Sequence, residues 1–154
     1  MKKLIAAVGI ILLFITLCFS GCEEVEVKPD YINVNCQVQA YVDLLDKYNN
    51  ILIEKPVGLM IRVDIIKDGG ERFTFHETVD KNGFIYTSPC TFKMYKEQPI
   101  EAILEVQGGY KDYYPTSPLS SKTLTWAQVE PTGFGGTYVW TEIFSIKLIN
   151  TTTP

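Results

Sequence analysis

The chain has few of the side chains that enzymes use for acid–base and metal chemistry. It contains one histidine, His76, which excludes a multi-histidine metal site and leaves little room for a histidine-based triad. No Cys-x-x-Cys pair occurs, so thioredoxin-like redox chemistry and zinc ribbons have no support. Gly-x-Ser-x-Gly, phosphate-loop and zinc-protease motifs are also missing. We therefore expect no enzymatic activity, no catalytic residue, no metal and no cofactor, and we expect His76 to be a solvated surface residue.

Basic residues are also scarce relative to acidic ones. Lysine and arginine number 14 against 18 acidic residues, which gives a formal net charge of −4. Residues 1–21 contain two lysines and no acid, so the remainder of the chain carries 12 − 18 = −6. An acidic body disfavours binding to nucleic acid and to anionic membrane surfaces. We expect no nucleic-acid partner.

The N-terminus has the pattern of an export signal. Two lysines precede an uncharged apolar run over residues 4–19, which is somewhat shorter than the roughly 20 residues needed to span a membrane stably. A Ser-Gly pair then leads to Cys22. Residues 19–22 resemble the lipobox of bacterial lipoproteins, with Phe19 at a position that is usually Leu. This resemblance implies that Cys22 is lipidated and that two or three acyl chains tether the protein to a membrane.

Two alternatives stay open for this segment: an uncleaved N-terminal helix with Cys22 as a plain thiol, and ordinary secretory cleavage. All three place the same domain outside the cytoplasm, and the lipoprotein alternative makes it a membrane-anchored protein of the cell envelope. The length suits one domain. We expect a signal peptide over residues 1–21, a charged tether over 22–31, a β domain over 32–149 and a disordered tail over 150–154. Residues 23–30 could instead form a first edge strand.

Strict alternation from Ile32 to Leu44 is the clearest structural pattern, because every second residue is apolar. It predicts a strand with one buried and one exposed face. The Asn82-Gly83 pair predicts a hairpin. Shorter patterns separated by turns predict further strands near residues 59–65, 73–76, 84–87, 90–95, 102–106, 119–127 and 138–149. The expected fold is an all-β, antiparallel, immunoglobulin-like sandwich of about seven strands behind an N-terminal hydrophobic signal helix, with no other helix.

Two cysteines belong to the predicted β domain. Cys36 and Cys90 both fall on the apolar phase of their strands, so both are expected to point into the core. In an oxidising compartment they could form a disulfide between the two sheets if their Cα atoms come within about 7 Å. The alternative is a pair of buried free thiols that pack as small hydrophobic side chains.

Three segments in the middle of the chain resemble prealbumin-like β-sandwiches, the group that includes carboxypeptidase regulatory-like domains and repeat domains of surface adhesins. Residues 42–50 resemble a strand that leads into the first turn, and residues 56–63 resemble the second strand after a Pro-containing connection. Residues 78–84 resemble the family's T-D-x-x-G-x-F hairpin, in which Gly83 takes a positive φ and Asp80 caps the turn. The resemblance implies a role in binding, spacing or stiffening.

Aromatic residues are concentrated between residues 110 and 140. Exposed aromatic rings on a β-sandwich can stack on sugars or anchor a protein partner. Tyr110, Tyr113 and Tyr114 are therefore candidate ligand-binding residues, whereas the two tryptophans of this region are in apolar phase and are expected to lie in the core. The expected function is a non-catalytic, membrane-tethered, extracytoplasmic module with a binding or structural role at the cell surface and an envelope protein as possible partner. The alternative is a carbohydrate-binding module that uses the Tyr and Trp residues of 110–140.

Overall fold

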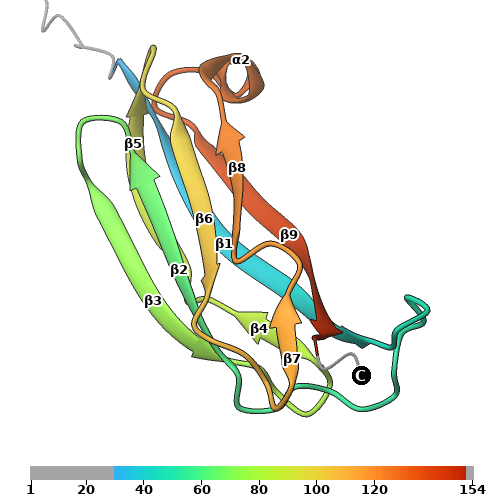
Figure 1. Cartoon of the computed structure of the whole chain (residues 1–154). Helices are drawn as coiled ribbons and strands as arrows, with labels where there is room; N and C mark the ends of the chain where they lie inside the picture. The colour runs from blue at the N-terminus through green and yellow to red at the C-terminus, as the bar shows by residue number, and fades with distance from the viewer. Residues whose placement is uncertain (1–29, 152–154) are drawn as a thin grey trace, which may run out of the picture.

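The computed structural model describes residues 30–151, which form two β-sheets around one hydrophobic core (Figure 1). Sheet A has the order β4-β1-β9-β7, and β5 also pairs with β1; sheet B has the order β3-β2-β6-β8. The strands of sheet A are β1 (Tyr31–Leu45), β4 (Phe84–Tyr86), β5 (Cys90–Tyr95), β7 (Tyr113–Pro115) and β9 (Thr137–Asn150). Those of sheet B are β2 (Met60–Lys67), β3 (Arg72–Thr78), β6 (Ile100–Val106) and β8 (Leu119–Leu124). An all-β, mostly antiparallel sandwich is confirmed.

The core is built from the apolar phases of the strands. In β1 the even-numbered residues from Ile32 to Leu44 are fully buried, as the alternation predicts. Trp140 and Phe144 of β9 are buried beside them, and β2 and β6 contribute their own inward residues from the facing sheet. Each large side chain removed from water stabilises the fold by roughly 1.5 to 3 kcal/mol. The odd-numbered residues of β1 consequently form the outer face of sheet A.

The two longest strands, β1 and β9, pair in parallel and run side by side behind sheet B in Figure 1. Their register extends from Asn33 opposite Thr137 to Leu45 opposite Ile149. The prediction of a purely antiparallel sandwich is wrong at this pair. Alternation specifies which face of a strand is buried but not the direction of its neighbour. Parallel neighbours need a long connection, and the seven strands between β1 and β9 supply it.

The turn between β3 and β4 has the predicted local chemistry but a different partner. Gly83 has a φ of 86°, and the Asp80 carboxylate accepts hydrogen bonds from the backbone N–H groups of Asn82 (2.8 Å) and Phe84 (2.9 Å). These bonds, above all the one from Phe84, hold the pKa of Asp80 below its ordinary value. The predicted hairpin is wrong, because β3 lies in sheet B whereas β4 pairs with β1 in sheet A. The turn is a corner between the two sheets.

Other differences lie in the C-terminal half. The strand expected over residues 119–127 ends at Leu124, and a helical turn α2 (Trp126–Val129) and a 3-10 turn η1 (Glu130–Thr132) follow. The sequence does not predict the short strand β7, and residues 30–151 form nine strands against the predicted seven or so.

The expected signal peptide, Cys22 and most of the tether lie outside the described residues. Within residues 30–151 no helix is both long and apolar enough to cross a membrane.

Candidate functional site

Cys36 and Cys90 lie opposite each other in the antiparallel β1–β5 ladder and are both buried thiols. The prediction that they point into the core is confirmed, but a bridge between the sheets is excluded because both belong to sheet A. The Cys36 thiol donates to the backbone carbonyl of Val34 at 3.8 Å. The proximity of the two thiols lowers the pKa of Cys90 and, together with burial, raises the pKa of Cys36. The two cysteines are positioned for a disulfide bond between neighbouring strands of sheet A.

The three candidate tyrosines do not form one surface. Tyr110 and Tyr113 are half-buried and pack against the core, whereas Tyr114 is 49% exposed and lies opposite Ile149 at the edge of sheet A. The Tyr110 hydroxyl donates to Glu54 at 3.3 Å. Glu54 also pairs with Lys111, and this contact lowers the pKa of Glu54 and raises that of Lys111. Tyr110 therefore helps to fix two loops together.

The tryptophans of the same region differ from each other. Trp140 is buried, as predicted, and its indole N–H donates to Glu142 at 2.9 Å. Trp126 is half-buried against the core and lies 5.8 Å from the exposed ring of Phe134. Neither tryptophan ring therefore forms an exposed binding surface together with Tyr110, Tyr113 and Tyr114.

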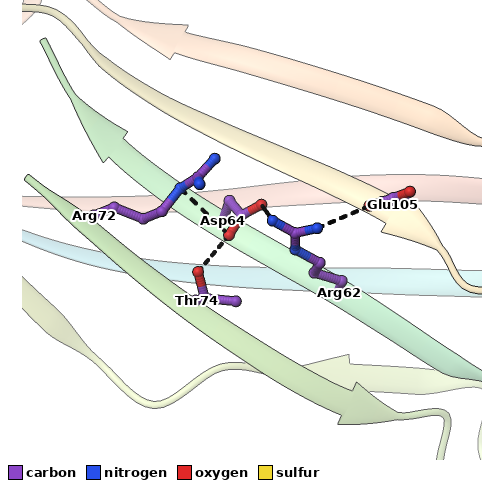
Figure 2. A network of polar contacts seen from close by, with 5 residues as sticks. All are labelled: Arg62, Asp64, Arg72, Thr74 and Glu105. Carbon is purple, nitrogen blue, oxygen red and sulfur yellow. Dashed lines mark hydrogen bonds and ion pairs between the residues drawn. The ribbon is translucent and has the colours of Figure 1, made fainter. Parts of the chain in front are cut away.

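The outer face of sheet B carries a network of charged side chains centred on Asp64 (Figure 2). The Thr74 hydroxyl donates to Asp64 at 2.5 Å, Arg62 lies 2.9 Å from its other oxygen, and Arg72 approaches at 3.6 Å. Arg62 also reaches Glu105 on β6 at 3.5 Å. Asp64 is only 6% exposed, so these partners replace the water contacts that burial removes from its carboxylate. The network joins β2, β3 and β6 and leaves no carboxylate oxygen of Asp64 without a partner.

His76 lies exposed on β3 opposite Arg62. Within the part of the chain that the structure describes, no group of three or more His, Cys, Asp or Glu side chains could hold a metal ion. The charged face of sheet B thus consists of groups that bind one another.

The outer face of sheet A has a different composition. It combines exposed rings, amides, hydroxyls and aliphatic side chains, and it has no charged residue over its central part. We call this surface the aromatic–amide face. Its members are Asn35, Gln37, Gln39 and Tyr41 on β1, Val139, Thr141, Ile143 and Ser145 on β9, Phe84 and Tyr86 on β4, and Thr91 on β5.

The rings of this face hold one another in place. Phe84 lies opposite Tyr41 in the ladder, with ring centroids 4.3 Å apart in an edge-to-face arrangement. Tyr86, two residues along the same strand, has its ring 5.9 Å from Phe84 and within 15° of parallel. Tyr41 is 42% exposed and Tyr86 50% exposed, while Phe84 between them is half-buried. Two accessible rings are therefore supported by a third.

An uncommitted amide lies beside these rings. Gln39 has Tyr86 on one side and Ile143 on the other, and among residues 30–151 its side chain takes part in no hydrogen bond. By contrast, the amide of Gln37 donates to the backbone carbonyl of Thr87 at 3.3 Å. Gln39 can thus hydrogen-bond a ligand that contacts the neighbouring rings.

Charged residues mark the two ends of the aromatic–amide face. At one end Asp43 pairs with Lys55 at 2.6 Å and has Lys147 opposite it on β9. At the other end Lys93 lies opposite Asn33, with its ammonium 4.6 Å from the centre of the adjacent Tyr31 ring. The uncharged part lies between these two rows.

The aromatic–amide face was not predicted from the sequence. In the sequence, Tyr41 falls on the polar phase of its predicted strand. Phe84 and Tyr86 fall in another predicted strand, and the sequence pattern gives neither ring a function. Their alternation around buried Ile85 indicates that both point outward, but their contact with Tyr41 depends on the β1–β4 register. No protein-family model and no curated protein sequence matches the chain.

Proposed function

We propose that this protein is a non-catalytic binding module, held on the outer side of a membrane by a lipid on Cys22, and that it binds through the aromatic–amide face. The observation that carries the proposal is the pair of accessible rings, Tyr41 and Tyr86, supported by Phe84 and surrounded by uncharged polar groups. Aromatic side chains at interfaces provide large contact areas at low entropic cost, and rings already fixed by neighbours lose little freedom on binding.

Support for the location comes from the sequence. Residues 19–22 have the lipobox pattern, and the chain that follows is acidic, which suits a domain kept off an anionic membrane surface.

The prealbumin-like fold is part of the same proposal. Two of the three segments support it: residues 42–50 span the end of β1 and the following turn, and residues 56–63 lead into β2. Residues 78–84 form a turn capped by Asp80, but this turn joins the two sheets and is not the hairpin that the resemblance implies. The alternative function, a carbohydrate-binding site made by the Tyr and Trp residues of 110–140, stays a prediction, and Tyr114 is the exposed member of its tyrosines.

A co-sedimentation assay tests the proposal. Protein purified from membranes of expressing cells would be mixed with envelope material of the same cells from which the lipids have been extracted, so that the lipid on Cys22 does not itself carry the protein into the pellet. The bound fraction would then be measured. We expect the Tyr41→Ala/Tyr86→Ala variant to bind at least about tenfold more weakly, since central interface rings contribute more than about 1.4 kcal/mol. Tyr48→Ala is the matched control, because Tyr48 is a 72% exposed loop tyrosine outside the face. Equal binding by wild type and the double variant would refute the assignment of the face.

A further inference from the structure

We infer that the ligand of the aromatic–amide face is a neutral polysaccharide. The inference rests on the proposed function, because it names the class of ligand for that same surface. A sugar ring presents two kinds of surface to a protein: C–H faces that pack on aromatic rings, and hydroxyl groups that need hydrogen-bond donors and acceptors at its edge. The face offers both within neighbouring rows of the sheet.

The arrangement of the rows provides the first argument. Tyr86, Gln39 and Ile143 form one row across β4, β1 and β9, and the next row along β1 contains Phe84, Tyr41 and Ser145. Neighbouring strands are about 4.8 Å apart, and same-face residues about 6.8 Å apart along a strand. A ring that packs on Tyr86 can therefore direct a hydroxyl toward the amide of Gln39, which has both donors and an acceptor to offer.

The length of the polar stripe provides the second argument. Beyond Gln39 the stripe continues along β1 through Gln37 and Asn35, flanked by the hydroxyls of Thr141 and Thr91. The Thr91 hydroxyl donates to the side-chain amide oxygen of Asn35 at 2.8 Å, which leaves the NH₂ group of the same amide able to donate outward. Repeated amides and hydroxyls along an extended strand suit a ligand that is itself a chain of repeating polyhydroxylated units.

Charge provides the third argument and selects a neutral chain. No member of the aromatic–amide face carries a positive charge that could form an ion pair with a carboxylate, sulfate or phosphate on a sugar. The chain from Cys22 onward has a net charge of 12 − 18 = −6, which repels acidic polysaccharides over distances of about the 8 to 10 Å screening length. An uncharged glycan avoids this repulsion.

The position of the amides argues against a protein partner. Protein interfaces concentrate apolar side chains at their centre and polar ones at the rim. Here the central strand β1 carries three amides beside the single exposed ring of Tyr41, and the other exposed apolar side chains lie on the flanking strands, as Tyr86 and Ile143 do. An apolar protein surface placed on this face would bury the Gln39 amide without a partner, which costs about 1 to 3 kcal/mol.

The test uses the envelope co-sedimentation assay after two treatments. Periodate oxidation destroys vicinal diols of sugars, and protease digestion removes protein partners. We expect binding to be lost after periodate, to survive protease, and to be unchanged between low and high salt. Affinity electrophoresis identifies the class of polysaccharide directly, because a polymer that binds the protein retards its migration. The gels would contain neutral glucan, mannan, galactan or xylan, with polygalacturonate as the acidic comparison. Gln39→Ala should weaken retardation at least about tenfold, with Tyr48→Ala as the control and thermal unfolding as a check that both variants fold.

The outcomes separate this inference from the proposed function. Binding that depends on Tyr41 and Tyr86 but resists periodate and is lost after protease would overturn the polysaccharide and leave the binding face in place. Stronger retardation by polygalacturonate than by every neutral polymer would also overturn it. Binding that does not depend on Tyr41 and Tyr86 would overturn both the face and its ligand.

Discussion

We predict that Cys36 and Cys90 form a disulfide when the protein folds in an oxidising compartment. Directly opposed residues of an antiparallel ladder have Cα atoms about 4.5 to 5.5 Å apart, which lies inside the range of about 4.4 to 6.8 Å that a disulfide spans. Cys90 is 8% exposed whereas Cys36 is fully buried, and the neighbouring Cys36 lowers the pKa of Cys90, so Cys90 is the thiol that attacks the compartment's disulfide oxidant. Cys36 then resolves the mixed disulfide.

The size of the effect follows from the loop that the bond closes, which spans 90 − 36 = 54 residues. The chain-entropy argument gives a stabilisation of about 4 kcal/mol for a loop of this length. With a urea dependence of about 2 kcal/mol per molar, reduction should lower the unfolding midpoint by about 2 M. Urea titrations with and without reductant measure the shift, and mass spectrometry under non-reducing conditions identifies the linked peptides.

The Cys36→Ala/Cys90→Ala variant is the control, because its midpoint should not respond to reductant. Two alkylatable thiols in protein recovered from the export compartment would refute the prediction that the bond forms. A linked form whose midpoint is unchanged by reduction would instead refute the loop-closure argument, and would mean that strain in the native sheet offsets the entropy gained.

Three further predictions concern the turn, the charged network and the anchor. Hydrogen bonds hold the pKa of Asp80 below its unfolded value of 3.8, so the stabilisation that Asp80 contributes is present above pH 3.8 and is lost as the pH falls through the folded pKa. Asp80→Asn keeps the acceptor oxygen but does not titrate. The fall in the urea midpoint between about pH 7 and about pH 3 should therefore be smaller in this variant than in the wild type. Thr74→Val should cost about 1.5 to 3 kcal/mol in urea unfolding, because it removes a hydrogen bond to buried, charged Asp64. Thr91→Val, which removes an exposed bond between neutral groups, should cost less than about 1 kcal/mol, and equal costs would contradict the role given to the network. Mass spectrometry of the N-terminal peptide should find acyl groups on Cys22, whereas an intact N-terminus beginning at residue 1 would favour an uncleaved anchor.

The sequence predicts burial in this protein far better than pairing. The alternation in β1 correctly assigns Cys36 to the core, and the apolar phase of β9 does the same for Trp140. These assignments need only the two-residue period of a strand. The parallel β1–β9 pair and the crossing of the 78–84 turn between sheets depend on contacts between distant segments, which a local pattern does not encode.

The candidate site was missed for the same reason. The amides that alternate along β1 are visible in the sequence, and so is the outward phase of Phe84 and Tyr86. Only the β1–β4 register places Phe84 beside Tyr41 and Tyr86 beside Gln39. A shift of one residue in that register would have turned both rings toward the core and left the amides without aromatic neighbours. Composition drew attention instead to residues 110–140, where most rings pack inward.

The two outer faces of the sandwich show why one is assigned to binding. On sheet B, Asp64 and Arg62 are joined to each other, and Thr74 donates to the same carboxylate, so a ligand would have to displace partners and desolvate charges. On sheet A, the rings are fixed while the Gln39 amide has no partner among the described residues, so a ligand would gain contacts and break none. Removal of the amide, as in Gln39→Ala, should therefore weaken binding without unfolding the protein, because the side chain is partly open to water and bonds no other described group.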